Sequence, residues 1–118
     1  MKYITFTILC YNSENYMRRC VDSLLVGGED VEILIIDDGS SDRTGAIADE
    51  YEMLYPNIVK AVHKPNGGHG SGVNKGLELA HGLYYKVVDS DDWLDENALT
   101  AVMEKLREVA KMPAPVDM

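Results

Sequence analysis

Four short apolar segments alternate along this chain with four segments of helical periodicity. The apolar segments cover residues 3–9, 31–36, 58–62 and 83–88. The helical segments begin near residues 14, 42, 73 and 95. The second apolar segment is hydrophobic at nearly every position, which is typical of a strand buried on both faces. This alternation predicts an α/β protein with a mostly parallel sheet between two layers of helices.

Length and composition fit a single domain of this kind. The chain has 118 residues, of which 46% are hydrophobic, enough for a core. We expect one domain over residues 1–112 and a short tail over residues 113–118. The net charge of -9 repels phosphate backbones and argues against nucleic-acid binding. No apolar run reaches the roughly 18 residues of a membrane span.

The two cysteines, Cys10 and Cys20, have neither metal-ligand nor redox spacing. Both lie in apolar or helical surroundings, so we expect buried free thiols. That expectation favours a reducing, cytoplasmic compartment.

An unusual polar or glycine-rich group follows each predicted strand. The groups are Tyr11-Asn12, Asp37-Asp38, the glycine-rich segment 66–72 and Asp89-Ser90-Asp91. Because the carboxyl ends of parallel strands meet at one edge of a sheet, we expect these groups to line one binding site.

The acidic run 89–92 contains three carboxylates within four residues. Such carboxylates repel one another unless a cation or a hydrogen-bond donor compensates them. In an extended segment Asp89 and Asp91 face the same way, and their hard oxygen ligands suit Mg²⁺ or Mn²⁺. We therefore predict a divalent-cation site at Asp91 and Asp89. For Asp92, capping of the following helix is an equally good interpretation.

The other groups each allow two interpretations. Asp37 and Asp38 could accept hydrogen bonds from a base or a sugar, or form a solvated turn. Tyr11 could stack on a planar base or pack beside the first strand. The glycine-rich segment matches neither a P-loop nor the dinucleotide fingerprint. It is either a flexible turn or a backbone that approaches a ligand closely, with His69 as a contact candidate.

In this order, the four groups resemble the motifs of the inverting family 2 glycosyltransferases. The matching segments are 11–14, 22–25, 32–44, 66–68, 74–76 and 89–92. The resemblance implies the N-terminal half of the A-type glycosyltransferase fold, a three-layer αβα Rossmann-like sheet. It also implies transfer of a sugar from a nucleotide-diphospho-sugar, most commonly a UDP-sugar, to an acceptor hydroxyl with inversion.

The resemblance also assigns roles to residues. The family residue that matches Tyr11 lies against the nucleobase, and an aspartate matching Asp37 or Asp38, most often the second, binds the base. The family's Asp-x-Asp, matching Asp89 and Asp91, holds ribose and a divalent cation, with Asp91 as the more direct ligand. The implied nucleotide-sugar site comprises Tyr11, Asn12, Asp37, Asp38, Gly68, His69, Asn74, Asp89 and Ser90.

Two departures from the family pattern matter. Many members have Ala-Arg-Asn where this chain has Gly72-Val73-Asn74, so diphosphate binding relies more on the cation and on His69. The family's catalytic base lies well beyond the Asp-x-Asp, and no residue up to Met118 matches it. We therefore expect a donor-binding half that is truncated at its C-terminal end and inactive alone.

The implied partners are a UDP-sugar and, in the full enzyme, a glycan or lipid-linked acceptor in polysaccharide or cell-envelope glycan synthesis. Apolar surface left by the absent half would promote homo-oligomers. Two alternatives stay open: a non-catalytic nucleotide-sugar-binding module and a metal-dependent phospho-acceptor receiver domain. A receiver needs its acidic pair after the first strand, whereas the acidic groups here follow the second and fourth.

Overall fold

A parallel four-stranded sheet forms the centre of the computed structural model, which describes residues 2–110, with the side chains of Glu96 and Ala110 left aside. The strands are β1 (Ile4–Cys10), β2 (Val31–Asp38), β3 (Val59–Lys64) and β4 (Tyr84–Asp89). Their order in the sheet is β3-β2-β1-β4, and every neighbouring pair is parallel. The predicted α/β class and parallel sheet are confirmed. The predicted domain end at residue 112 and the tail 113–118 lie outside the described residues.

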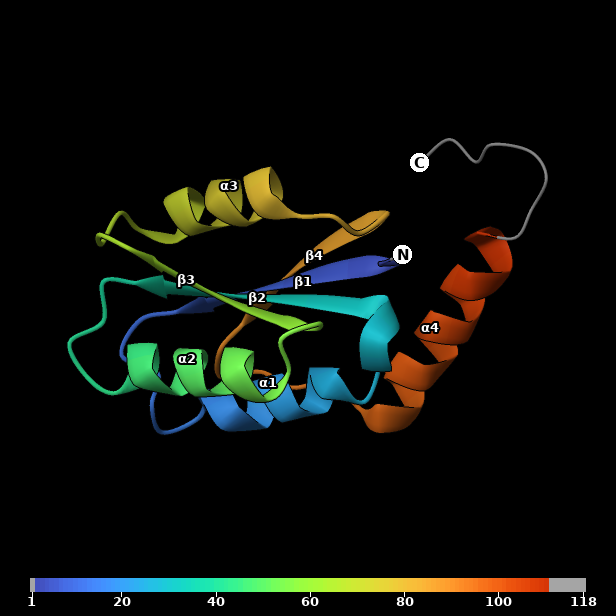
Figure 1. Ribbon diagram of the computed structural model, residues 1–118, viewed down its shortest axis with the longest axis horizontal. Coiled ribbons are helices and arrows are strands. Elements are labelled where there is room, and N and C mark those ends of the chain that lie inside the picture. The colour runs from blue at the N-terminus through green and yellow to red at the C-terminus, as the bar shows by residue number, and fades with distance from the viewer. Residues whose placement is uncertain (1, 111–118) are drawn as a thin grey trace.

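Helices cover both faces of the sheet. They are α1 (Met17–Leu25), α2 (Thr44–Leu54), α3 (His69–Leu79) and α4 (Glu96–Ala110), with a short 3-10 turn, η1 (Gly28–Asp30). Helices α1 and α2 lie under one face and α3 lies alone over the other, while α4 lies beyond α1 at the end where β1 begins (Figure 1). The three layers that the sequence predicted are therefore present.

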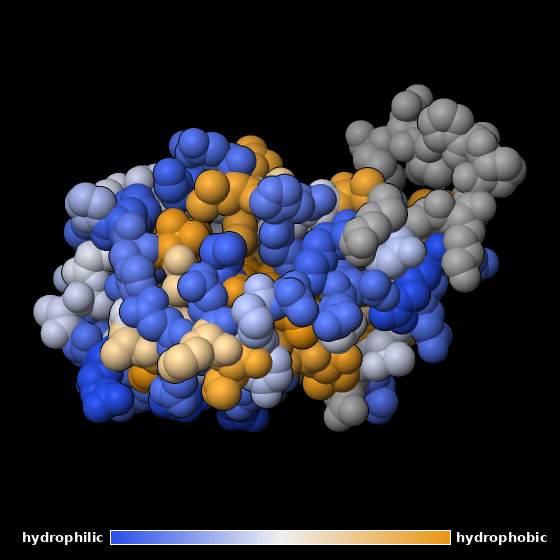
Figure 2. All heavy atoms as spheres, in the orientation of Figure 1, coloured by the Kyte–Doolittle hydropathy of each residue, from blue (hydrophilic) through white to orange (hydrophobic). Residues whose placement is uncertain are grey.

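The core lies mainly between the sheet and helices α1 and α2. Side chains of β1 and β2 meet Met17 and Leu24 of α1 and Ile47 of α2, all of them buried. Hydrophilic side chains cover most of the face seen in Figure 2, with smaller apolar areas between them. Among residues 2–110, no helix is both long enough and apolar enough to cross a membrane.

Two helices begin at residues that differ from the prediction. Helix α1 begins at Met17 rather than near residue 14. The Ser13 hydroxyl bonds to the Ser90 hydroxyl and therefore does not cap the N–H groups that follow Ser13. The Ser13 carbonyl accepts the N–H groups of Tyr16 and Met17 instead. Helix α3 begins at His69, inside the segment predicted to be a loop.

Helix α4 packs against the fold through a narrow apolar face. Its N–H groups at Asn97 and Ala98 are capped by the Asp95 carboxylate, at 2.9 and 3.1 Å. Leu99 and Met103 are buried, whereas Val102 is 45% exposed.

Helix α3 approaches the sheet closely through glycines. Gly72 and Gly76 are its buried residues. A Cβ on Gly76 would lie only 2.6 Å from the Tyr85 hydroxyl and from Thr7 Cγ2, and one on Gly72 would lie 2.8 Å from Leu9 Cδ2. The glycines thus set how near α3 comes to β1 and to β4.

We predict that Gly76→Ala destabilises the fold by about 1–3 kcal/mol, because the new methyl group overpacks the contact with β1 and β4. Gly70→Ala is the matched control in the same helix, since a Cβ there meets nothing within 4 Å. Its higher helix propensity should stabilise the fold by about 1 kcal/mol or less. Urea unfolding of both variants measures the difference, and equal effects would contradict the close approach.

Candidate functional site

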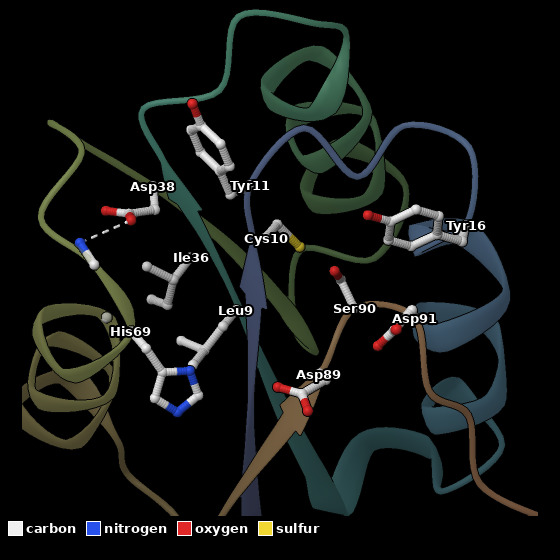
Figure 3. Close-up of a pocket in the computed structure, with 12 residues that line it drawn as sticks. Leu9, Cys10, Tyr11, Tyr16, Ile36, Asp38, His69, Asp89, Ser90 and Asp91 are labelled. Carbon is white, nitrogen blue, oxygen red and sulfur yellow. Dashed lines mark hydrogen bonds between the residues drawn. The ribbon is translucent and has the colours of Figure 1, made fainter.

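A cavity of about 400 Å³ opens at the carboxyl ends of the strands. Asp38 and His69 lie on one side of it, Tyr16 and Asp91 lie on the other, and Tyr11 stands over the end of β1 (Figure 3). The cavity therefore lies at the sheet edge where the sequence placed a binding site.

Most of the predicted site residues line this cavity. Those that do are Tyr11, Asp38, Gly68, His69, Asp89, Ser90 and Asp91. Three predicted residues lie outside its lining: Asn12, Asp37 and Asn74. Gly72, from the glycine-rich segment expected at the site, also lines the cavity, and the sequence analysis did not select four further lining residues: Leu9, Cys10, Tyr16 and Ile36. Tyr16 precedes α1 and is 43% exposed.

The Asp38 carboxylate shapes one wall of the cavity. Its Oδ1 accepts hydrogen bonds from Lys64 Nζ at 2.6 Å and from Gly67 N at 2.9 Å, and its Oδ2 accepts one from Gly68 N at 3.0 Å. Burial opposes ionisation, but these donors outweigh it and hold the pKa of Asp38 below its ordinary value. Asp38 thus fixes the turn that leads into α3.

Asp37 points to the opposite face of the sheet because successive strand residues alternate. It is 7% exposed, and its carboxylate accepts the Ser40 N–H at 3.0 Å. His63 Nδ1 lies 3.0 Å from Asp37 Oδ2, and His63 Nε2 lies 2.7 Å from Asp49 Oδ1. Hydrogen bonds to Asp49 and then to Asp37 raise the pKa of His63 above its ordinary value of 6.5. Asp37 therefore connects β2 to β3 and, through His63, to α2.

Asn12 joins two loops at the edge of the cavity. It has a positive φ of 49°. Its side-chain oxygen accepts the Ser41 N–H at 2.8 Å, and its own N–H donates to the Ser40 hydroxyl at 3.0 Å. Asn12 thus holds the segment after β1 against the segment after β2, while Asn74 is an exposed residue of α3.

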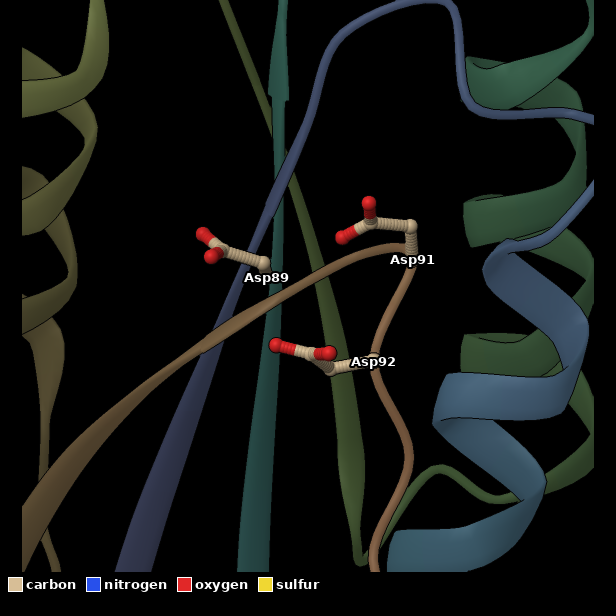
Figure 4. Close-up of side chains that lie close together, drawn as sticks. All are labelled: Asp89, Asp91 and Asp92. Atoms are coloured by element: carbon tan, nitrogen blue, oxygen red, sulfur yellow. The ribbon is translucent and has the colours of Figure 1, made fainter.

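Three carboxylates gather where β4 ends. One oxygen from each of Asp89, Asp91 and Asp92 lies within 4.8 Å of the others, and all three residues are exposed (Figure 4). A turn bond from Asp92 N to Asp89 O, 3.0 Å long, brings Asp92 back towards Asp89. Because Asp95 caps α4, capping does not occupy Asp92. Clustered hard oxygen ligands open to solvent fit Mg²⁺ or Mn²⁺, which keep several of their waters.

A parallel sheet between two layers of helices, with a polar cavity at its carboxyl edge, defines the class of α/β proteins that bind ligands at that edge. Within that class, the profile of glycosyl transferase family 2 matches residues 5–113, and the chain belongs to this family. The resemblance recognised in the sequence motifs is therefore confirmed.

Curated relatives cover most of the chain. Glycosyltransferase GlyG of Streptococcus pneumoniae is 35% identical over 107 residues, which are 89% of this chain and 35% of GlyG. The poly(ribitol-phosphate) beta-glucosyltransferase of Bacillus spizizenii is 38% identical over 100 residues, 81% of this chain and 16% of the relative. The chain thus spans about a third or less of the length of these two relatives.

Solved structures share the fold. S. aureus TarS 1-349 in complex with UDP-GlcNAc has a TM-score of 0.76 and 30% identity, over 92% of this chain and 32% of TarS. The mannosyltransferase PcManGT of Pyrobaculum calidifontis, in complex with GDP-Man and Mn²⁺, has a TM-score of 0.73 and 19% identity, over 85% of this chain and 31% of PcManGT. Both comparisons confirm the predicted A-type Rossmann-like fold.

We predict that His63 makes stability depend on pH. A group whose pKa is raised by folding stabilises the fold fully below its ordinary pKa, here 6.5, and loses that contribution as pH rises through the folded-state pKa. Wild type should therefore exceed His63→Gln in stability by more at about pH 5.5 than at about pH 8.5. Asp49→Asn removes the charged partner that contributes most to the raised pKa of His63. It should therefore reduce the dependence of this stability difference on pH. A gap between wild type and His63→Gln that is constant with pH, measured by urea unfolding, would contradict the assignment.

Proposed function

We propose that this chain binds the sugar donor of a family 2 glycosyltransferase, a nucleotide-diphospho-sugar and most simply a UDP-sugar, through a divalent cation. The observation that carries the proposal is the acidic cluster at the end of β4, which shares one cavity with Tyr11 and Asp38. The TarS complex with UDP-GlcNAc, whose fold this chain shares at 30% identity, supports the choice of donor.

The nucleobase is assigned to the side of the cavity that carries Tyr11 and Asp38. Tyr11 is 54% exposed, so a face of its ring is available for stacking on a base. Asp38 Oδ2 accepts one hydrogen bond among the described residues, from Gly68. A carboxylate oxygen has two acceptor sites, so Oδ2 retains one for the ring N–H of a base.

The diphosphate is assigned to the side that carries Asp89 and Asp91. No ion pair joins Asp89, Asp91 or Asp92 to another residue in the described part of the chain, so their charges repel a diphosphate. A divalent cation held by Asp91 and Asp89, with Asp92 adjacent, would neutralise the charge of the departing diphosphate. Mn²⁺ and Mg²⁺ both suit these ligands. His69, the first residue of α3, and Gly68, which precedes it, line the same cavity.

For the whole protein we propose sugar transfer with inversion. The hydroxyl of a glycan or lipid-linked acceptor would attack the anomeric carbon, and a general base would remove its proton. We assign that base to no residue among the 118 of this chain. Polysaccharide or cell-envelope glycan synthesis fits the printed names of the relatives, such as the poly(ribitol-phosphate) beta-glucosyltransferase.

The proposal also covers the compartment in which the protein acts and its assembly. Cys10 and Cys20 are buried free thiols, which suits a reducing cytoplasm or the cytoplasmic side of a membrane. Leu77 and Leu83 are exposed apolar side chains, and such surface favours contact with further parts of the protein or with a second copy.

The experiment that tests the donor site is calorimetry of UDP with this chain, with Mn²⁺ and with a chelator. We predict binding that requires the cation, and Asp91→Asn should weaken it at least tenfold in Mn²⁺ because a direct ligand becomes neutral. Asp95→Asn removes the same charge outside the cluster, and Asn remains a good helix cap, so it should bind as wild type does. Equal UDP affinity in Mn²⁺ and in chelator would refute the proposal.

A further inference from the structure

Two loops that are distant in sequence form neighbouring parts of the cavity wall. The segment after β1 carries Tyr11, whereas Asp89 is the last residue of β4 and the segment after β4 carries Asp91. Beneath them a direct side-chain bond connects the two loops: Ser13 Oγ lies 2.8 Å from Ser90 Oγ. Ser13 is 1% exposed and Ser90 is 7% exposed, so water does not replace this bond freely.

Ser13 is held in place from three directions. Its N–H donates to Thr44 Oγ1 at 2.7 Å, and Thr44 is fully buried at the start of α2. Its hydroxyl accepts the Tyr11 N–H at 3.1 Å. Its carbonyl accepts the N–H groups of Tyr16 and Met17, where α1 begins. Ser13 therefore offers the loop after β4 a fixed anchor that belongs to the rest of the fold.

Ser90 connects the anchored Ser13 to the acidic cluster. It stands between Asp89 and Asp91 in the chain. The thiol of Cys10 lies beside both hydroxyls, and burial raises its pKa to about 12, so the thiol stays neutral there. Without Ser90, the Ser13 hydroxyl keeps its bonds to the Tyr11 backbone, with the Tyr11 N–H at 3.1 Å and the Tyr11 carbonyl at 3.3 Å. Without Ser13, the buried Ser90 hydroxyl loses its hydroxyl partner, which favours a shift of the loop after β4.

We propose that the Ser13–Ser90 hydroxyl pair is a positioning device that couples the nucleobase end of the donor site to its cation end. Ser13 sets the backbone beside Tyr11, and Ser90 sets the two aspartates on either side of it. Because such coupling is reciprocal, cation binding alters the affinity for the base by the same factor by which base binding alters the affinity for the cation. This inference rests on the proposed donor site and assigns Ser90 to the support of that site rather than to direct contact with the ligand.

The test measures each end separately, with Mn²⁺ alone by electron paramagnetic resonance and with uridine alone by NMR titration. Ser13→Ala, on the nucleobase side, should weaken Mn²⁺ binding roughly three- to tenfold, and Ser90→Ala, on the cation side, should weaken uridine binding by a similar factor. The double variant should lose no more than either single variant, because both remove the same bond.

Ser23→Ala is the matched control. The Ser23 hydroxyl accepts the Leu94 N–H at 3.1 Å and so tethers the other end of the loop after β4, with no bond to Ser13. Its effects should add to those of Ser13→Ala. A merely structural role for the serine pair would lower the unfolding temperature and leave both affinities unchanged, which would overturn the proposal.

The outcomes separate this inference from the donor site itself. If wild type binds Mn²⁺ and uridine but each serine variant affects only its own end, the coupling is wrong and the donor site stands. If wild type binds neither probe, both proposals fall. If Ser13→Ala does not fold, Ser90→Ala with uridine decides alone, since it leaves the loop after β1 unaltered.

Discussion

Parallel hydrogen bonding on both sides of β1 is the constraint on which the rest of the structure depends. Over its whole length β1 pairs with β2, and from Ile4 to Leu9 it also pairs with β4. These registers set Cys10 level with Asp37 and Leu9 level with Asp89. Segments that are distant in sequence therefore end at one edge, and the polar groups at their ends enclose a single cavity.

The carboxylates at this edge of the sheet are of two kinds. In the pairing of β2 with β3, Asp37 faces His63 and Asp38 faces Lys64, so the neighbouring strand supplies a basic partner to each aspartate. The cluster at the end of β4 has no such partner among the described residues. In a chain with a net charge of -9, a bound cation would relieve the most charge repulsion at that cluster. This contrast separates carboxylates that already have a basic partner from carboxylates that are available to a cation.

The sequence predicted the sheet and the position of the site because both follow from the alternation of apolar and helical segments along the chain. Apolar runs that end in polar groups locate the carboxyl edge without any knowledge of contacts. The family resemblance favoured the second aspartate, Asp38, for the base. Periodicity alone did not show which aspartate of the pair faces the cavity, because it shows that the two point to opposite faces of the sheet but not which face α3 covers. Nor could it predict that α3 begins at His69, because its glycines serve close packing against β1 and β4 rather than a flexible loop. The Ser13–Ser90 bond joins residues 77 positions apart and leaves no periodic signal.

The central claim is that the carboxyl edge binds a nucleoside diphosphate with its cation at the end of β4 and its base beside Tyr11. NMR of the isotope-labelled chain with UDP, in Mg²⁺ and then with a trace of paramagnetic Mn²⁺, tests this most directly. The account predicts that Mn²⁺ broadens the amide signals of residues 89–92 most strongly. With Mg²⁺–UDP, the signals of Tyr11, Asp38 and Gly68 should shift while those of α4 beyond its first turn stay in place. Broadening centred elsewhere, or UDP-induced shifts that spare the Tyr11 and Asp38 side of the cavity, would contradict it.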